Sequence, residues 1–198
     1  MRCSLLVLLV LSGCGVTENQ ADVAGSVPKA CEDATVAPDF VYPDGPYGTK
    51  VGDRFAPFAL MDCDGKPVKF SDVLGSGSLA LVVVAAGWCA PCVAESKGIE
   101  VEYYERYCER GLRVVQVLYE DEDGNPAGPL FCQKWKDRFG LAFPVVTDPD
   151  FTFKKYFQGS LAESTPLNIL VDRAGVIRYV TMGPVPADFR DRIEGLLP

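Results

Sequence analysis

Continuous apolar runs alternate along the chain with segments whose apolar residues recur at helical spacing. The uninterrupted run at residues 79–86 predicts a strand buried on both faces, and residues 112–119 predict a second such strand. Residues 92–110 predict a helix, because apolar side chains recur every three or four positions, and Gly111 follows as a C-cap. The chain therefore contains at least one strand–helix–strand unit.

Shorter patterns complete the series. They predict two strands at 55–60 and 67–70 joined by a turn at 62–65, a helix at 129–139, a strand at 144–147, a short helix at 151–157, strands at 167–172 and 176–182, and a closing helix at 187–197. Strands that alternate with helices predict an α/β fold. We expect a mainly parallel central sheet with an N-terminal β-hairpin and helices on both faces.

The N-terminus has the pattern of an export signal. Arg2 is its lone charge, and the apolar core at residues 4–11 is too short to span a bilayer as a helix. Leu11-Ser12-Gly13-Cys14 resembles the lipobox of bacterial lipoproteins, which implies cleavage after residue 13 and acylation of Cys14. The alternative is an ordinary cleaved signal with a chance cysteine.

Three segments are expected: a lipoprotein signal peptide at 1–13, a lipidated tether with an irregular extension at 14–50, and one domain at 51–198. The formal net charge of −8 gives the protein no general attraction for nucleic acid. The acids at 120–123 do not match a calcium-binding loop, so we interpret them as a solvated surface.

Trp88-Cys89-Ala90-Pro91-Cys92 stands between the first buried strand and the long helix. A helix start offers unpaired N–H groups and the positive end of the dipole, which both favour a thiolate. We expect Cys89 to be partly exposed and to attack a disulfide, and Cys92 to be more buried and to resolve the mixed disulfide. Pro91 suits the first helical turn.

The motif has two other interpretations, a zinc site and an inert disulfide. Zinc usually needs a second pair of ligands, and the chain has no histidine and no second C-x-x-C. We therefore predict no metal and no cofactor.

Four further cysteines could form structural bridges. Sequence alone does not fix their pairing. We predict a Cys31–Cys63 disulfide that pins the tether to the hairpin, with Cys63–Cys108 as its main rival. Cys108–Cys132 is disfavoured, because a rising strand of about 26 Å separates the two helix ends.

The chain resembles the tethered TlpA-like and ResA-like branch of the thioredoxin superfamily. The motifs that carry the resemblance are Val51-Gly52-Asp53, Pro57-Phe58-Ala59-Leu60, Asp64-Gly65-Lys66, the C-x-x-C pentapeptide, Thr165-Pro166 and Asp172-Arg173-Ala174-Gly175. The resemblance implies a thioredoxin-like fold, thiol–disulfide exchange and a cis Thr165–Pro166 bond beside the dithiol. The backbone of Thr165 would then be free to pair with an extended substrate, and Trp88, Ala90 and Pro91 would line the same groove.

Glu95 matches the acidic residue of the C-x-x-C-x-x-E pattern in this branch, which implies that it takes and returns the proton of the resolving thiol. The alternative is a surface glutamate in the first helical turn. Cytosolic thioredoxins carry a buried acid six residues before the first cysteine, but this chain has Val83 there. The proton must then be moved by Glu95 or by water, or the site has no strong proton shuttle.

The expected function is a thiol–disulfide oxidoreductase, lipid-anchored on the periplasmic side of the cell envelope. Its partners would be exported protein thiols or disulfides and an upstream electron donor. Gly15 follows the lipidation site and is not an aspartate retention signal, which favours the outer membrane over the inner one. A thiol peroxidase is the second hypothesis, but Ala86 and Val82 stand where that class has a hydroxyl residue and a proline. A third is a lipoprotein binding module with an inert disulfide.

Overall fold

The computed structural model describes Cys31 and residues 34–198. The predicted signal peptide and the predicted lipidation site, Cys14, lie outside the described residues. Among the described residues, no helix combines the length and the apolar character needed to cross a membrane.

One seven-stranded sheet organises the domain, in the order β2-β1-β5-β4-β3-β6-β7. The strands are β1 (Ala59–Asp62), β2 (Pro67–Lys69), β3 (Leu79–Ala86), β4 (Leu112–Glu120), β5 (Val145–Thr147), β6 (Leu167–Asp172) and β7 (Ile177–Met182). The α/β fold class and the β1–β2 hairpin are confirmed. The sheet is mixed rather than mainly parallel, because only β3–β4 and β4–β5 run parallel, and the hairpin strands and β6 enter antiparallel.

The centre of the sheet forms the core. Every residue of β3 is buried, and β4 is buried over most of its length. A strand buried on both faces must pair its polar backbone groups with neighbouring strands, and β3 has β4 on one side and β6 on the other. The two central strands therefore form a rigid base for the loops that follow them.

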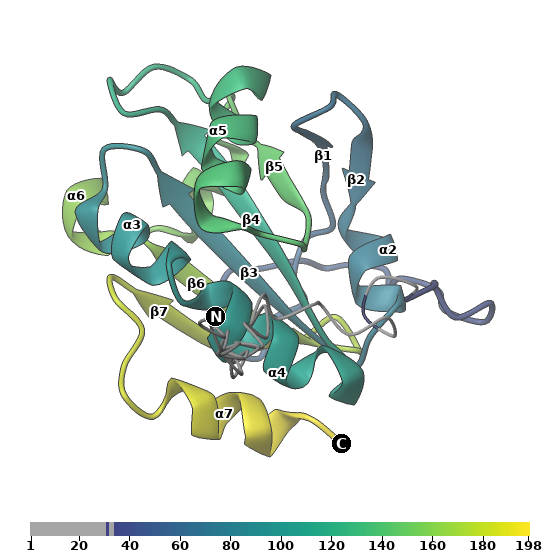
Figure 1. Ribbon diagram of the computed structural model, residues 1–198. Helices are drawn as coiled ribbons and strands as arrows, with labels where there is room; N and C mark the ends of the chain where they lie inside the picture. Colours follow the sequence, from purple (N-terminus) through teal and green to yellow (C-terminus); the bar gives the residue numbers. More distant parts are fainter. Residues whose placement is uncertain (1–30, 32–33) are drawn as a thin grey trace, which may run out of the picture.

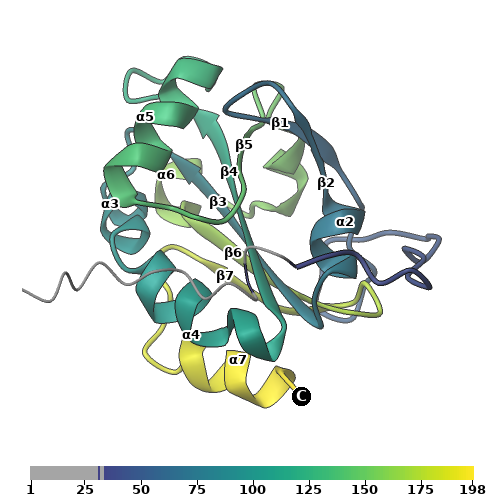
Figure 2. The same cartoon turned by 45° about the vertical axis from the view of Figure 1, so that its right-hand side comes forward.

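The helical segments are α2 (Phe70–Gly75), α3 (Ala90–Ser96), η1 (Glu100–Tyr104), α4 (Glu105–Tyr107), η2 (Cys108–Arg110), α5 (Pro129–Phe139), η3 (Thr152–Tyr156), α6 (Leu161–Ser164) and α7 (Phe189–Leu196). Figures 1 and 2 show α3, α4, α5 and α7 on one side of the sheet. An aromatic cluster packs around η3 and consists of Phe55, Phe58, Phe70, Phe153 and Tyr156.

The long helix predicted at 92–110 is broken into several segments. It leaves α-geometry after Ser96, passes Gly98 and continues as the π-turn η1. Glycine weakens a helix interior, so the break occurs where the backbone is freest. Gly111 has a φ of 99° and ends the series, as predicted.

The predicted Cys31–Cys63 disulfide is wrong. The structure pairs Cys31 with Cys108 and Cys63 with Cys132, with Cα–Cα distances of 5.5 and 5.1 Å. The rival Cys63–Cys108 pairing is excluded as well, and Cys108 and Cys132 are not joined to each other.

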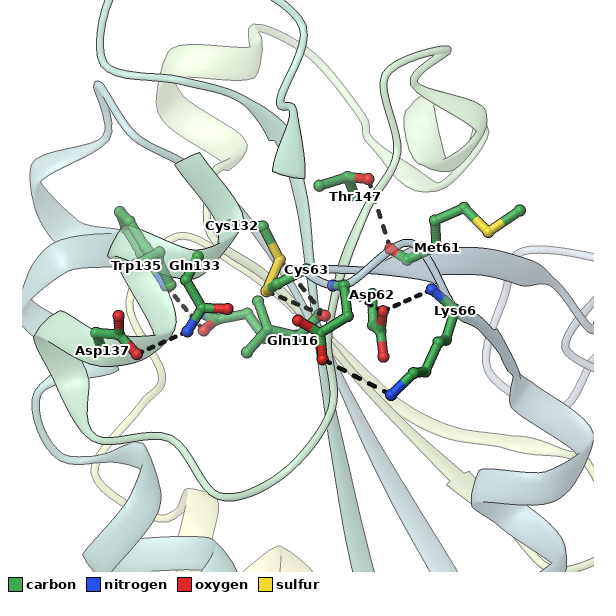
Figure 3. Close-up of a disulfide and its surroundings, with 12 residues drawn as sticks. Met61, Asp62, Cys63, Lys66, Gln116, Cys132, Gln133, Trp135, Asp137 and Thr147 are labelled. Atoms are coloured by element: carbon green, nitrogen blue, oxygen red, sulfur yellow. Dashed lines mark hydrogen bonds and ion pairs between the residues drawn. A yellow bond between two sulfur atoms is a disulfide. The ribbon is translucent and has the colours of Figure 1, made fainter. Parts of the chain in front are cut away.

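The position of β5 explains why Cys63 meets Cys132. The end of β1 pairs with β5, which brings the hairpin turn to the start of that strand. The Sγ atoms of Cys63 and Cys132 lie 3.8 and 3.6 Å from the carbonyl oxygen of Val145. Both sulfur atoms therefore lie next to the first residue of β5, where they form the disulfide shown in Figure 3. The turn therefore lies beside the first turn of α5 rather than at the opposite edge of the sheet.

Candidate active site

The C-x-x-C motif lies where the central strand β3 passes into α3. Cys89 is the N-cap of α3, and its Sγ accepts a hydrogen bond from the backbone N–H of Cys92 over 3.1 Å. The two cysteines form a disulfide with a Cα–Cα distance of 5.2 Å. Cys89 is 3% exposed and Cys92 is 1% exposed, so the expected partial exposure of Cys89 is wrong for this oxidised form.

Gly87 allows the segment before Cys89 to pack closely against the loop that follows β4. Its N–H donates to the carbonyl of Glu120 over 2.9 Å. A Cβ at this position would lie 2.5 Å from the backbone nitrogen of Glu122 and 2.6 Å from the carbonyl carbon of Asp121. Only glycine permits this close approach, which keeps the acidic loop against the residue before the motif.

Trp88 is held by a carboxylate. Its Nε1–H donates to Oε2 of Glu120 over 2.6 Å, and its ring contacts Tyr119 edge-on with centroids 6.2 Å apart. A hydrogen bond to an ionised group is stronger than a neutral one. Neighbouring residues at the end of β4 therefore set the orientation of the tryptophan next to Cys89.

The Thr165–Pro166 peptide bond is cis, as the resemblance implied. Thr165 is 1% exposed, and its Oγ1 lies 3.1 Å from the hydroxyl oxygen of Tyr119. The expectation that the whole Thr165 backbone is free is wrong for its N–H, which donates to the carbonyl of Leu161. The reason is that α6 ends at this residue and uses the N–H to close its last turn.

Glu95 lies half-buried on α3, one turn beyond Cys92. Burial raises its pKa from 4.5 to about 7, and a hydrogen bond from Asn168 and one from the Val185 backbone offset part of that rise. Its Oε1 is buried and has no hydrogen-bond partner among the described residues. A group that titrates near pH 7 suits proton transfer under ordinary conditions.

A cavity of about 260 Å³ lies along the same side of α3. It is lined by Pro91, Ala94, Glu95, Gly98, Glu102, Tyr103, Pro184 and Val185. The cavity thus extends from the motif residue Pro91 to the Glu95 carboxyl group, and its volume leaves room for water there.

Three residues that sequence reasoning missed contribute to this site: Tyr119, Glu120 and Asn168. Asn168 is 1% exposed and pairs across the β3–β6 ladder with Val83, the residue that replaces the buried thioredoxin acid. Its Nδ2 donates to Oε2 of Glu95 over 3.4 Å. A polar residue inside the apolar run at 167–171 was a signal that could have identified it.

The described residues contain no group of three or more His, Cys, Asp or Glu side chains that could hold a metal ion. The acidic loop illustrates why. Asp121 accepts hydrogen bonds from the backbone N–H groups of Asp123 and Asn125, and these bonds lower its pKa, so it stabilises its own turn.

Comparison with known proteins places this site in a family. The profile of the AhpC/TSA family matches residues 51–180, which include the C-x-x-C motif and the cis-proline. The chain belongs to the AhpC/TSA family. The matched segment covers more than half of the sequence, so the assignment does not depend on the cysteine motif alone.

Within this family, the chain is similar to proteins named thiol-disulfide oxidoreductase ResA. It is 29% identical to ResA of Geobacillus thermodenitrificans over 150 residues, which cover 75% of this chain and 79% of the relative. It is 25% identical to ResA of Bacillus subtilis over 125 residues, or 63% of each chain. Together with the dithiol at the start of α3, these relatives identify this family member as a thiol–disulfide oxidoreductase.

Solved structures show the same thioredoxin-like fold. A thiol:disulfide interchange protein of the thioredoxin family from Chlorobium tepidum aligns with a TM-score of 0.57 at 22% identity, over 79% of this chain and all of the other. Peroxidoxin BcpB from Mycobacterium tuberculosis aligns with a TM-score of 0.60 at 18% identity, over 75% and 97% of the two chains. At these identities the likeness concerns the fold alone.

Proposed function

We propose that this AhpC/TSA family member exchanges its Cys89/Cys92 dithiol with cysteines of exported proteins, and that Cys89 is the attacking thiol. One observation carries the assignment: the sulfur of Cys89 is the N-cap of α3 and accepts the backbone N–H of Cys92. Once the disulfide is reduced, that N–H and the helix dipole stabilise a thiolate at position 89.

The reaction balances as two exchanges. The Cys89 thiolate attacks one sulfur of a substrate disulfide, the other sulfur leaves as a thiolate, and a mixed disulfide forms. The Cys92 thiolate then attacks Cys89 Sγ and releases the second substrate thiol. The substrate gains two electrons and the enzyme becomes the Cys89–Cys92 disulfide. An upstream thiol donor restores the dithiol, and the same steps in reverse oxidise a substrate.

Glu95 is proposed to accept the proton of Cys92 before the second exchange. A carboxylate whose pKa is about 7 can hold that proton near neutral pH and return it to a leaving thiolate. Asn168 supports this role. It lies on β6, next to β3, and its side-chain amide donates a hydrogen bond to the Glu95 carboxylate. Val83 supplies no acid from β3, so Glu95 takes over that task.

The proposed substrate groove lies between the motif and the cis-proline loop. Trp88, Ala90 and Pro91 form one side, and Thr165 and Pro166 form the other. Ala90 and Pro91 are exposed, so a polypeptide can reach this side of the otherwise buried disulfide. The carbonyl of Thr165 would accept a hydrogen bond from an extended substrate, whereas its N–H remains engaged with Leu161.

The location is proposed from the sequence at the N-terminus. Cleavage after residue 13 and acylation of Cys14 would leave the domain on a tether at the periplasmic side of a bacterial envelope membrane. The disulfides Cys31–Cys108 and Cys63–Cys132 support an oxidising compartment outside the cytoplasm. Exported proteins and an upstream thiol donor are the partners that such a position offers.

A thiol peroxidase is the second candidate, because peroxidoxin BcpB shares the fold. Ala86 and Val82 are fully buried apolar residues and provide no hydroxyl group to bind a peroxide. This observation favours disulfide exchange.

Two assays distinguish the candidates: reduction of insulin disulfides with a dithiol as donor, and consumption of hydrogen peroxide with the same donor. We expect the protein to accelerate insulin reduction, and the Cys89→Ser variant to lose this activity. Peroxide consumption should stay at the level of the dithiol alone. Rapid peroxide consumption without insulin reduction would establish the peroxidase instead. Inactivity in both assays would leave a binding module with an inert disulfide.

A further inference from the structure

Tyr119 occupies an irregular position at the end of β4. Ala85 of β3 pairs with Leu118, but the next residue, Ala86, pairs with Glu120, so Tyr119 is an extra residue in the ladder. A bulge of this kind re-aims a side chain at the edge of a site. The tyrosine is 1% exposed, and its two ends contact the two sides of the proposed groove.

The hydroxyl end of Tyr119 reaches the cis-proline loop, and its ring contacts Trp88, the residue before Cys89. The hydroxyl oxygen lies 3.1 Å from Oγ1 of Thr165, the residue that forms the cis bond with Pro166. The ring meets Trp88 at an interplanar angle of 81°. Tyr119 thus contacts both the residue before Cys89 and the residue before the cis-proline.

The Tyr119 ring is stacked on the ring of Phe151. Their rings are stacked with centroids 4.1 Å apart and an interplanar angle of 14°. Phe151 has a φ of 49°, and no other described non-glycine residue has a positive φ. A bulky residue adopts this conformation only when its surroundings impose it.

Asp148 holds the turn that imposes this conformation. Its Oδ1 accepts hydrogen bonds from the N–H and the hydroxyl of Thr152, and its Oδ2 accepts one from the N–H of Phe153, each over 3.0 Å. The side chain is fully buried, so these bonds are shielded from water. The turn therefore fixes Phe151, and Phe151 fixes the plane of the Tyr119 ring.

We propose that Tyr119 is a positioning residue that fixes the spacing between Trp88 and the Thr165–Pro166 loop, and so sets the affinity for an extended protein substrate. This inference rests on the proposed function of the groove. Burial also raises the pKa of Tyr119, which keeps its hydroxyl protonated and able to hydrogen-bond with Thr165 at physiological pH. The residue is proposed to act through its two neighbours, Trp88 and Thr165.

The test compares Tyr119→Phe, Thr165→Val and the double variant. A neutral hydrogen bond is worth roughly 2-fold to 12-fold in an equilibrium constant. We expect each single variant to raise KM for insulin reduction within that range at nearly constant kcat. The double variant should show no more than the effect of one single variant, because both changes remove the same bond. Additive effects, or an unchanged KM in Tyr119→Phe, would overturn the proposal.

Tyr107→Phe is the matched control. Tyr107 is also buried, and its hydroxyl donates to Glu194 over 2.7 Å, at the end of the helical series remote from α3. Like Tyr119→Phe, this variant loses one hydrogen bond of a buried hydroxyl. Both variants should therefore lose a modest amount of stability, but Tyr107→Phe should leave KM unchanged. A raised KM in the control would mean that any buried hydroxyl has the effect, which would contradict a specific role for Tyr119.

Amide hydrogen exchange provides a readout that does not depend on catalysis. The N–H of Thr165 is bonded to Leu161, and loosening the loop should speed its exchange several-fold in Tyr119→Phe and not in Tyr107→Phe. If wild-type protein reduces no insulin, the proposed function fails, and exchange alone decides whether Tyr119 holds the loop. Unchanged exchange at Thr165 would overturn the inference even in an active enzyme.

Discussion

The side-chain amide of Asn168 donates to Oε2 of Glu95 over 3.4 Å, directly across the β3–β6 ladder from Val83. The β-strand that carries the buried acid in cytosolic thioredoxins is apolar here, and the polar pair comes instead from β6 and α3. Glu95 is therefore the titratable group that the fold places one helical turn beyond Cys92, and we propose that its raised pKa affects exchange.

Glu95→Gln should change the pH dependence of exchange. In wild type the carboxyl loses its proton at a pKa of about 7, so the exchange rate should show an inflection there. The glutamine variant keeps the shape but has no proton to transfer, and the inflection should disappear. Rates of insulin reduction between pH 5.5 and pH 8.5 provide the measurement.

Glu100→Gln is the control for that experiment. Burial also raises the pKa of Glu100 to about 7, but its Oε2 accepts the N–H of Ala142 rather than a partner beside the dithiol. Its substitution should leave the inflection in place. Identical profiles for wild type and Glu95→Gln would show that Glu95 takes no part in proton transfer.

The same shift predicts how stability depends on pH. Glu95 ionises near pH 4.5 in the unfolded chain and near pH 7 in the folded protein, so the folded state binds more protons between these values. The free energy of unfolding should therefore fall as the pH rises from about 4.5 to 7. Urea titrations at pH 5 and pH 8 should show a smaller fall for Glu95→Gln than for wild type. An equal fall would contradict the raised pKa.

Asn168→Leu should move the Glu95 pKa further upward. The amide hydrogen bond lowers that pKa, and leucine has a similar volume without a donor. The inflection in the exchange rate should shift to higher pH, by an amount that a titration of the carboxyl by NMR measures independently. A downward shift would mean that Asn168 destabilises the carboxylate.

The Cys63–Cys132 disulfide should contribute substantially to stability. It closes a loop with a sequence separation of 69 residues, and loss of such a bridge costs about 2–5 kcal/mol. Replacing both cysteines with serine should lower the urea concentration at the midpoint of unfolding. The initial rate of insulin reduction should stay close to that of wild type. Mapping of non-reduced peptides should recover Cys63 with Cys132, and Cys31 with Cys108. Recovery of Cys31 with Cys63 would contradict the structure.

Gly87→Ala should disturb the C-x-x-C motif more than the addition of one methyl group suggests. The added carbon would meet the backbone of Asp121 and Glu122, which cannot move as a side-chain end can. Either the acidic loop or the Trp88 segment must shift, so we expect slower exchange and a lower melting temperature. Gly128→Ala is the matched control, because a Cβ there meets no atom within 4 Å. Equal behaviour of the two variants would contradict the close approach at Gly87.

Elements with strong local signals were predictable from the sequence. Residues 79–86 and 129–139 were predicted with the bounds that the structure shows for β3 and α5. One is an uninterrupted apolar run, and the other begins at a proline and ends at a glycine. The C-x-x-C motif was likewise evident from the sequence, and the resemblance to the thioredoxin superfamily implied the cis Thr165–Pro166 bond that the structure shows.

Features that depend on distant neighbours were not predictable in the same way. The direction of β6 and the pairing of β1 with β5 are set by the path of the chain, and the wrong Cys31–Cys63 prediction follows from missing that pairing. The sequence predicts Tyr119 as the end of an ordinary strand and Glu120 as part of a solvated acidic surface. The second expectation is wrong for Glu120, which lies in β4 and accepts the Nε1–H of Trp88. The residue pairs of the β3–β4 ladder reveal the bulge at Tyr119. The side-chain contacts then show that Tyr119 reaches both Trp88 and Thr165, whereas Glu120 accepts the Nε1–H of Trp88.

The most direct test of the account is a trapping experiment with Cys92→Ser and Cys89→Ser in the producing cells, followed by non-reducing electrophoresis. We predict that Cys92→Ser accumulates mixed disulfides with other proteins through Cys89, because the resolving thiol is absent, and that these disulfides disappear on reduction. Cys89→Ser should accumulate none. Trapping by Cys89→Ser alone would contradict the assignment of Cys89 as the attacking thiol.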